Sequence, residues 1–575
     1  MDKSDRIAGR REYRLFGMLL FPAALLLGVL YYAHTLEDAF ITFRYAEHCA
    51  DGYGIGAWNT DGAPVEGYST PLWMGLMTLC SALGINMLTA AKTIGIASHL
   101  LLIALFLTAA VKRGRTLDGP DSPLQIHRDV FILAGAMFAF NLPLAWYASS
   151  GMESLPFMCL ITLLLLGPLV VDSPGRLRII APAAAALLVL LRPEGILFAV
   201  LISAVHMLRA RDEAGMFKVW RNALLSGALA FAALLIMRLL VFGEFLPNTY
   251  YAKADGGLRH WMLGGIYMYR WLTSHVPIVF VIAVGAMGVY LQTRRQTKEG
   301  HPDGRSLLQR LRGFEFILFL LLLPLLYVVY IVKVGGDDYS AFPLWRHMLH
   351  ILPFWALTTA AGICVIMPKL RWGRYALMLI LVAAMNGKNL MVRNAQLLDE
   401  TRTALAQDAP LEHRPPNPYF SWIKSFSDHQ TLIASSFGGE LPFVVDARHI
   451  DVLGLNDLHI ARQGRFDPNG PVDSKTDMDY VVRQRPDFIE GYISMAELMS
   501  CVPREVLFDY RTQMSQGLID NPMFRREYLL VLNAPYKTMD RALFIRRDFW
   551  EHHPQRAQIQ VRELEETCLY GSPKE

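Results

Sequence analysis

An uncharged run near the N-terminus constrains this chain most. The 22 residues from Leu15 to Leu36 carry no formal charge. At a rise of about 1.5 Å per residue, a helix of that length crosses a hydrocarbon layer of about 30 Å. The residues at its end, Tyr31 to Asp38, offer no small-residue site of the kind at which a signal peptide is cleaved. We therefore expect the run to remain as a membrane-spanning helix.

Apolar runs continue along two thirds of the chain. Hydrophobic residues make up 53% of it and charged residues 18%, whereas soluble domains carry about 25% charged residues. The segment 71–85 is also apolar, but at about 15 residues it is short for a span, so we expect it as a helix on the outer surface. The sequence predicts a polytopic α-helical membrane protein with about eleven spanning helices, near residues 15–34, 88–111, 130–148, 153–171, 177–191, 195–208, 219–242, 275–292, 314–333, 348–367 and 375–394.

Lysines and arginines are distributed unequally between the predicted loops. With the N-terminus on the cytoplasmic side, the inner segments hold 24 of them and the short outer loops hold six. Because cytoplasmic loops are enriched in these residues, we expect a multi-pass protein of a bacterial inner membrane. Its N-terminus would be cytoplasmic and its C-terminal domain periplasmic.

The composition changes near residue 395, where charge rises and no later apolar run is long enough to span. We expect a transmembrane domain over 1–395, with a catalytic first outer loop at 34–87, and a soluble domain over 396–575. Segments 443–446, 528–532 and 542–546 read as strands, which predicts a small α+β domain. Cys501 and Cys568 could pair there in an oxidising compartment, or stay free.

Two adjacent acids, Glu37 and Asp38, follow the first helix directly. In a helical segment Glu37 and Arg44 would share one face, and Asp38 would lie on the next face with Tyr45. A carboxylate with a basic residue two turns along suits a general base beside an anion-binding group. The alternative is that the two acids only stabilise the start of a helix through its dipole.

Other polar residues map to the same outer side. Arg192 lies between two short helices, where it could snorkel to a lipid phosphate or hold a substrate phosphate, and Arg238 has the same two interpretations. The pair Asp337-Asp338 could bind a divalent cation, although a solvated turn is the alternative. We find no P-loop and no dinucleotide-binding glycine motif. An outward-facing enzyme would therefore need a donor that arrives through the bilayer, such as a polyprenyl-phosphate sugar. Its phosphate would need cationic partners, for which the candidates are Arg192, Lys253, Arg346, His347 and Arg44.

Seven segments in order resemble the membrane glycosyltransferases of the GT-C superfamily, and most closely the AftB-like arabinofuranosyltransferase family, to which pilin arabinosyltransferases are similar. They are Glu37–Tyr45, Val65–Trp73, Ser150–Glu153, Arg192–Gly195, Leu246–Tyr250, Gly335–Asp337 and Leu453–Asp457. The resemblance implies a periplasmic active site with Asp38 as catalytic base, assisted by Glu37. It implies substrate-binding roles for Tyr45, Glu66, Tyr68, Glu153, Glu194, Asn248, Tyr250 and Asp337.

The expected reaction transfers a sugar, arabinofuranose first and a hexose as the alternative, from the lipid phosphate to a glycan or protein acceptor. Asp38 would take the proton of the acceptor hydroxyl while basic residues stabilise the departing phosphate. A carboxylate could instead act as a nucleophile in a two-step path. The competing classes are a lipid-linked-sugar transporter and a non-catalytic envelope scaffold.

Overall fold

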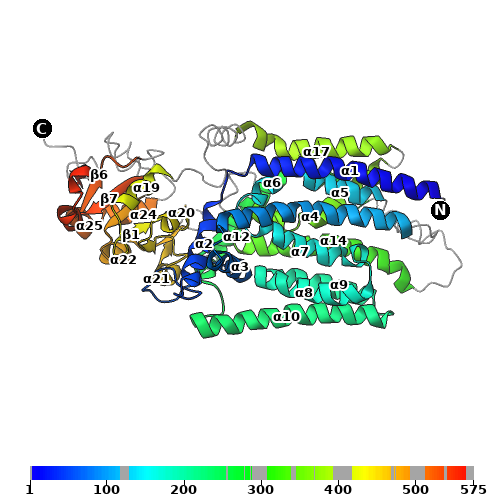
Figure 1. Cartoon of the computed structure of the whole chain (residues 1–575), viewed down its shortest axis with the longest axis horizontal. Coiled ribbons are helices and arrows are strands. Elements are labelled where there is room, and N and C mark those ends of the chain that lie inside the picture. Colours follow the sequence, from blue (N-terminus) through cyan, green and yellow to red (C-terminus); the bar gives the residue numbers. More distant parts are fainter. Residues whose placement is uncertain are drawn as a thin grey trace.

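The computed structural model of the chain describes residues 3–116, 128–253, 257–277, 279–284, 287, 307–337, 345–367, 370–392, 417–467, 470, 472, 474–491, 512–535 and 541–564. These residues form an elongated molecule (Figure 1). A helical bundle that starts at the N-terminus occupies one end, and an α/β region that contains the C-terminal strands occupies the other.

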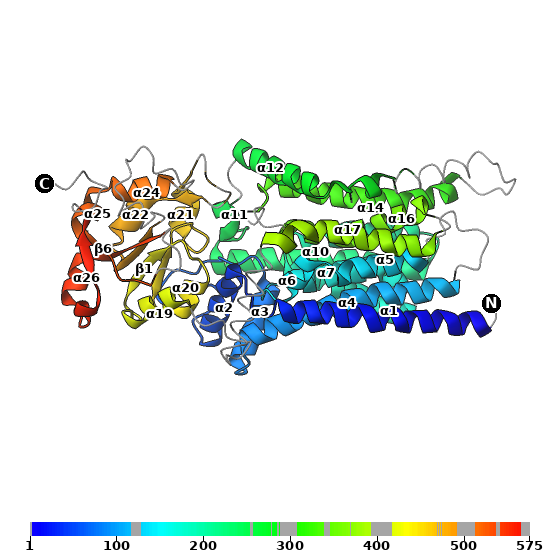
Figure 2. The same cartoon turned by 90° about the horizontal axis from the view of Figure 1, so that it is seen from above.

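Long apolar helices run side by side along the bundle (Figures 1 and 2). In most of them apolar residues cover every face of the helix, as expected for helices surrounded by lipid or by other apolar helices. The bundle helices are α1 (Lys3–Leu30), α4 (Met87–Thr116), α5 (Arg128–Ala139), α6 (Leu142–Ala148), α7 (Ser154–Val170), α8 (Pro174–Leu191), α9 (Gly195–Arg209), α10 (Ala214–Phe242), α14 (Leu307–Lys333), α16 (Leu352–Ile366) and α17 (Arg371–Val392).

Three described helices are long and apolar enough by themselves to cross a membrane: Met87–Lys112, Pro174–Leu191 and Ala214–Phe242. The helix pair α5 and α6 would make a fourth span if it crosses as one unit. Shorter apolar helices of 10–17 residues lie within most of the other predicted spans and within the predicted surface helix 71–85, but they are too short to count as spans by themselves. These are Leu15–Leu30, Pro71–Ala82, Ser154–Val170, Gly195–Arg209, Phe319–Lys333, Leu352–Ile366 and Trp372–Asn386.

The predicted helix 130–148 is wrong as a single element. The chain bends by 62° between α5 and α6. The Asn141 side chain accepts a hydrogen bond from the Leu144 backbone N–H and so begins a new helix, and Pro143 occupies its first turn. Proline has no N–H to continue the preceding helix and is favoured in a first turn. This break leaves Asn141 and Pro143 at the edge of the pocket described below.

The predicted outer loop 243–274 is largely helical. It contains α11 (Asn248–Lys253) and α12 (Leu258–Ser274), and α12 packs along α14. Of the predicted span 275–292, the structure describes residues 275–277, 279–284 and 287, and it is helical at 276–277, 279–284 and 287. Arg259, His260 and Arg270 limit the uncharged run within α12 to about ten residues, too short to be predicted as a span.

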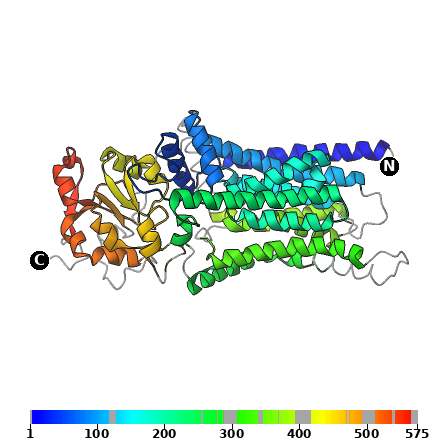
Figure 3. The ribbon, with the colours of Figure 1, turned by 90° about the horizontal axis from the view of Figure 1, so that it is seen from below.

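The first loop, residues 34–87, folds into α2 (Glu37–Ala50) and α3 (Pro71–Ala82). Both are dark blue in Figures 1 and 3, where they lie between the bundle and the C-terminal region. The second of these helices confirms the short helix predicted over 71–85. The first loop is therefore one of the elements through which the two ends of the molecule meet.

The C-terminal region is built on a six-stranded sheet in the order β2-β1-β5-β7-β6-β8. The three strands at one side of the sheet, β2-β1-β5, pair in parallel, and the remaining pairs are antiparallel. The strands are β1 (Leu432–Ser435), β2 (Arg448–Asp451), β5 (Phe488–Gly491), β6 (Tyr528–Val531), β7 (Ala542–Arg546) and β8 (Val561–Glu563), with a separate pair β3 (Arg465–Phe466) and β4 (Lys475–Thr476). The helices of this region are α19 (Pro418–Ser425), α20 (Glu440–Val444), α21 (Leu458–Gln463), α22 (Met478–Arg483), α24 (Thr512–Ile519), α25 (Pro522–Glu527) and α26 (Arg547–His552), with one 3₁₀ turn at Arg556–Gln558.

Two of the three predicted strands are confirmed, since 528–532 forms β6 and 542–546 forms β7. The third is wrong, because the segment 443–446 begins inside α20 and leaves it at Val445. Cys501 and Cys568 lie outside the described residues, so their pairing stays a prediction.

Candidate active site

The helix α2 fixes the predicted carboxylates in place. It begins at Glu37, so both acids occupy its first turn, where the helix dipole favours negative charge. The residue before it, Leu36, donates its backbone N–H to the Ser150 carbonyl at 2.9 Å. This bond ties the start of α2 to the turn between α6 and α7.

Asp38 contacts a second acid through a shared arginine. Its Oδ2 accepts a hydrogen bond from Arg346 Nη1 at 2.7 Å, and Arg346 Nε lies 2.9 Å from Asp337 Oδ2. The arginine begins the short helix α15 (Arg346–Leu349). Asp38 keeps 19% of its side chain exposed, against 11% for Arg346 and 5% for Asp337. We call these three residues the Asp38 cluster; the structure brings Asp38 to two predicted site residues about 300 positions further along the chain.

Arg192 belongs to a second trio. Its guanidinium pairs with Glu153, and its Nε lies 2.6 Å from Glu194 Oε1. Glu153 and Glu194 stand at the N-termini of α7 and α9, and Arg192 stands at the C-terminus of α8. Each charge therefore suits the helix end that carries it. Arg192 is therefore not a lone cation in this conformation, and its predicted phosphate-binding role stays a prediction.

Tyr147 and His347 lie between the two trios. The Tyr147 side chain is fully buried, within electrostatic reach of Asp38, Asp337, Arg192 and Arg346, and its hydroxyl has no hydrogen-bond partner among the described residues. Burial lowers the pKa of His347 to about 4, because desolvation disfavours the imidazolium. His347 is therefore neutral near pH 7, which corrects its predicted role as a cationic phosphate partner. Sequence reasoning missed Tyr147, although the polar run that follows it was a usable signal.

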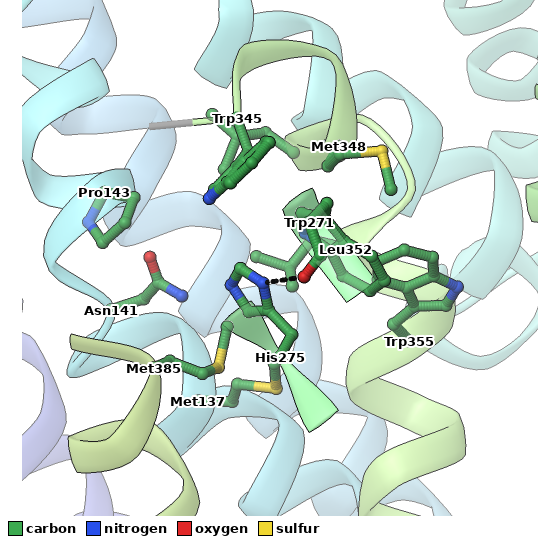
Figure 4. Close-up of a pocket in the computed structure, with 11 residues that line it drawn as sticks. Met137, Asn141, Pro143, Trp271, His275, Trp345, Met348, Leu352, Trp355 and Met385 are labelled. Atoms are coloured by element: carbon green, nitrogen blue, oxygen red, sulfur yellow. Dashed lines mark hydrogen bonds between the residues drawn. The ribbon is translucent and has the colours of Figure 1, made fainter. Parts of the chain in front are cut away.

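An aromatic pocket opens beside the Asp38 cluster (Figure 4). It is a small, partly open pocket with a cavity volume of about 40 Å³. Three tryptophans dominate its wall, and the side chains of Asn141, His275 and Trp345 face the same space. The lining comes from the α5–α6 break, the end of α12, the segment around α15, α16 and α17: Met137, Asn141, Pro143, Trp271, His275, Trp345, Met348, Leu349, Leu352, Trp355 and Met385.

Trp345 joins this pocket to the Asp38 cluster. Its indole lines the pocket, and the next residue in the chain is Arg346. Its backbone has φ 41° and ψ 51°, the left-handed conformation that bulky residues rarely adopt. Such a conformation costs about 1–3 kcal/mol and persists where the surroundings impose it. Trp345 is 5% exposed, and its Nε1 has no hydrogen-bond partner within the described part of the chain.

Two residues of α2 have contacts other than those predicted. Arg44 is buried, and its guanidinium donates to the backbone carbonyls of Trp58, Pro442 and Ala447. A guanidinium enclosed by carbonyls has no face left for a phosphate, so its predicted phosphate-binding role is corrected. Glu37 accepts hydrogen bonds from Gly439 and Glu440 in the C-terminal region.

Several predicted substrate-binding residues instead join parts of the molecule. Tyr45 Oη donates to Asn456 Oδ1 at 3.1 Å, and Asn248 Nδ2 donates to the Gly454 and Leu455 carbonyls at 2.9 Å each. Glu66 forms a buried ion pair with Arg238 at 2.7 Å, which also settles the two interpretations of that arginine. We call Tyr45, Glu66, Arg238, Asn248 and Asn456 the seam. The seam residues are almost fully buried, so a direct substrate contact is excluded for them in this conformation.

The remaining predicted site residues lie in neither the Asp38 cluster nor the seam. The Tyr68 hydroxyl donates to the Ile55 carbonyl at 2.8 Å, inside the first loop. Tyr250 and Lys253 lie on α11, both half-buried, beside the seam residue Asn248. Asp338 lies outside the described residues. Within the described ranges, no group of three or more His, Cys, Asp or Glu side chains is arranged to hold a metal ion.

Neither a protein-family model nor a curated protein sequence matches the chain. Among solved structures, the chain is similar to the arabinofuranosyltransferase AftD from mycobacteria, with 15% identity and a TM-score of 0.43. The match covers 92% of this chain and 41% of that protein, so this chain spans less than half of its length. A likeness of this size identifies neither the activity nor the substrate of this chain.

Proposed function

We propose that this chain transfers a sugar from a polyprenyl-phosphate donor to an acceptor hydroxyl, with Asp38 as the general base. The Asp38 cluster carries the proposal, because it places a partly exposed carboxylate and an arginine next to an apolar pocket. The sequence motifs favour arabinofuranose as the sugar and a cell-envelope glycan or protein as the acceptor. The asymmetry of lysines and arginines supports a periplasmic site in a bacterial inner membrane.

The charges of the cluster suggest the order of events. Among the described residues Arg346 faces two carboxylates, Asp38 and Asp337. A phosphate matches the guanidinium fork in two parallel hydrogen bonds, so the donor phosphate competes with Asp38 for Arg346. A carboxylate released from a cation binds a proton more readily. Donor binding would thus free Asp38 to act as a base.

The sugar is then transferred in one displacement at its anomeric carbon. The acceptor oxygen attacks the anomeric carbon and its proton passes to Asp38. The bond between the anomeric carbon and the phosphate oxygen breaks, and its electron pair leaves on the polyprenyl phosphate, which Arg346 stabilises. Arg346 is a better partner for this group than His347, because His347 is neutral.

The pocket offers a place for the apolar part of the donor. Its wall of tryptophan, methionine and leucine side chains suits a hydrocarbon chain. Trp345 lines the pocket and directly precedes Arg346, so the apolar wall and the arginine lie next to each other. The cavity, at about 40 Å³, would have to widen to admit a hydrocarbon chain.

Asp38→Asn tests the proposal, because it keeps the size and hydrogen bonding of the side chain and removes its basicity. We expect the release of polyprenyl phosphate from an extracted pool of lipid-linked sugars to fall by about a hundredfold or more. Asp51→Asn, at the exposed other end of the same helix, is the matched control and should stay within about twofold of wild type.

Wild-type release by folded Asp38→Asn would remove Asp38 from the mechanism. The same assay separates the competing classes, because a transporter or a scaffold releases no polyprenyl phosphate.

A further inference from the structure

The helix α2 lies between the C-terminal region and the bundle and contacts both. On the C-terminal side it packs against α20, where the Phe443 ring lies 5.4 Å from that of Phe40 and 6.2 Å from that of Phe43. On the bundle side Asp38 pairs with Arg346. A displacement of α20 would therefore move α2 relative to Arg346.

The two adjacent acids of α2 contact different parts of the molecule. Glu37 Oε1 accepts hydrogen bonds from the backbone N–H groups of Gly439 at 2.5 Å and Glu440 at 3.3 Å. Asp38 contacts the bundle through Arg346. Because consecutive residues of a helix move together, the position of Glu37 sets the position of Asp38.

The contact at Gly439 is too close for any other residue. A Cβ atom there would lie 2.2 Å from the Glu37 carbonyl oxygen and 3.0 Å from its Oε1. At the neighbouring Gly438 a Cβ atom would meet nothing closer than 3.6 Å. Neither glycine has a positive φ, so the difference between the two positions is one of space alone.

A second contact lies two turns along the same helix. Arg44 donates to the Pro442 and Ala447 carbonyls, on either side of the end of α20, and also to the Trp58 carbonyl in the first loop. Glu37 and Arg44 thus hold both ends of α20 against α2. This explains why both side chains point away from the Asp38 cluster.

We propose that Glu37 is a positioning residue: by accepting hydrogen bonds from Gly439 and Glu440, it seats α2 on the C-terminal region and holds Asp38 at Arg346. The C-terminal region is then a working part of the active site. The inference rests on the proposed function in one respect, namely that Asp38 is the base.

The protonation of Glu37 gives the proposal a distinctive consequence. Burial, and next the charge of Asp38, raise the pKa of Glu37 to about 8. The charge of Asp451, at the end of β2, also raises this pKa, and the backbone N–H bonds from Gly439 and Glu440 lower it. Near pH 7 Glu37 is therefore mostly a neutral acid, whose Oε1 still accepts both N–H bonds. A glutamine offers the same acceptor and no basicity.

Four variants test the proposal, with polyprenyl-phosphate release from extracted lipid-linked sugars as the assay. We expect Gly439→Ala to lower kcat at least about tenfold, with the donor KM within about threefold, because small misplacements of catalytic groups are costly. Gly438→Ala is the matched control and should behave as wild type. We expect Glu37→Ala to lower kcat as Gly439→Ala does, and Glu37→Gln to stay within about threefold of wild type.

Hydrogen exchange of the backbone in residues 37–46 supplies a readout independent of turnover. It should rise in Gly439→Ala and Glu37→Ala and stay unchanged in Gly438→Ala and Glu37→Gln. Wild-type kcat in Gly439→Ala, or a loss in Glu37→Gln as large as in Asp38→Asn, would overturn the positioning role. If Asp38→Asn is active, the proposed function fails instead, and the exchange data still decide whether Glu37 seats α2.

Discussion

The Asp38 cluster and the seam each contain a first-loop carboxylate, Asp38 or Glu66, paired with an arginine from elsewhere in the chain. The surroundings of the two pairs differ. Asp38 shares Arg346 with Asp337 and keeps 19% of its side chain exposed. Glu66 has Arg238 to itself, and the two side chains are 2% and 1% exposed. One carboxylate remains accessible for an exchange of partners, and the other is enclosed.

This difference in burial separates a carboxylate that can react from one that only stabilises the fold. A closed, fully paired ion pair is costly to break, because removal of one partner leaves a buried charge uncompensated. An accessible carboxylate that competes with another for one arginine can leave it at lower cost. Polar residues in similar motifs can therefore play opposite roles, and burial together with partner number distinguishes them.

The largest expected effect lies in the seam. Glu66→Ala leaves the buried guanidinium of Arg238 without its carboxylate and should lower the free energy of unfolding by about 3–5 kcal/mol. Thermal unfolding of the purified protein in detergent measures it. Asp61→Asn, whose ion pair with Arg448 is half exposed, is the control and should change little. Equal effects of the two changes would refute the distinction.

Tyr45→Phe should have the next largest effect. It removes the hydroxyl that joins Gly67 N–H to Asn456, and leaves two buried polar groups with one partner fewer. A loss of about 1–3 kcal/mol in the free energy of unfolding is expected, with turnover per folded molecule unchanged. A fall in turnover at wild-type stability would return Tyr45 to the substrate-binding residues.

A dependence on pH should appear at Glu37, between the two regions. Its pKa is raised by burial from 4.5 to about 8, so folding takes up a proton between these values. The stabilisation is complete below about pH 4.5 and is lost as the pH rises through about 8. The unfolding midpoint of wild type should therefore fall more steeply between about pH 5 and 8 than that of Glu37→Gln. Parallel curves would show that Glu37 does not titrate in this range.

The smallest effect is expected at the rim of the seam. Arg462 and Glu244 pair at 2.7 Å, but their side chains are 33% and 32% exposed. Such pairs contribute about 0–1 kcal/mol. We expect Arg462→Ala to shift the unfolding midpoint only slightly, and to shift it less at high salt because ions screen the pair. A loss as large as that of Glu66→Ala would mean that partial exposure is no guide to the strength of these pairs.

Sequence reasoning succeeded where a residue acts within its own element. Apolar runs are sufficient to predict helices such as α7 and α10, and β-branched and aromatic residues predict β6 and β7. It failed where neighbours decide. The segment 443–446 has strand-forming residues, but the seating of α20 on α2 makes its first part helical. The break between α5 and α6 follows from the Asn141 cap, which an apolar run conceals.

For the active site, the sequence by itself determined that Glu37 and Asp38 directly follow the first apolar run, and that Arg346 lies on a later loop. Only the tertiary structure decided that Asp38 contacts Arg346 while Glu37 and Arg44 contact the C-terminal region. Spacing along a helix fixes the angle between side chains but not the groups they meet. Those groups come from residues more than 300 positions away, and only packing brings them together.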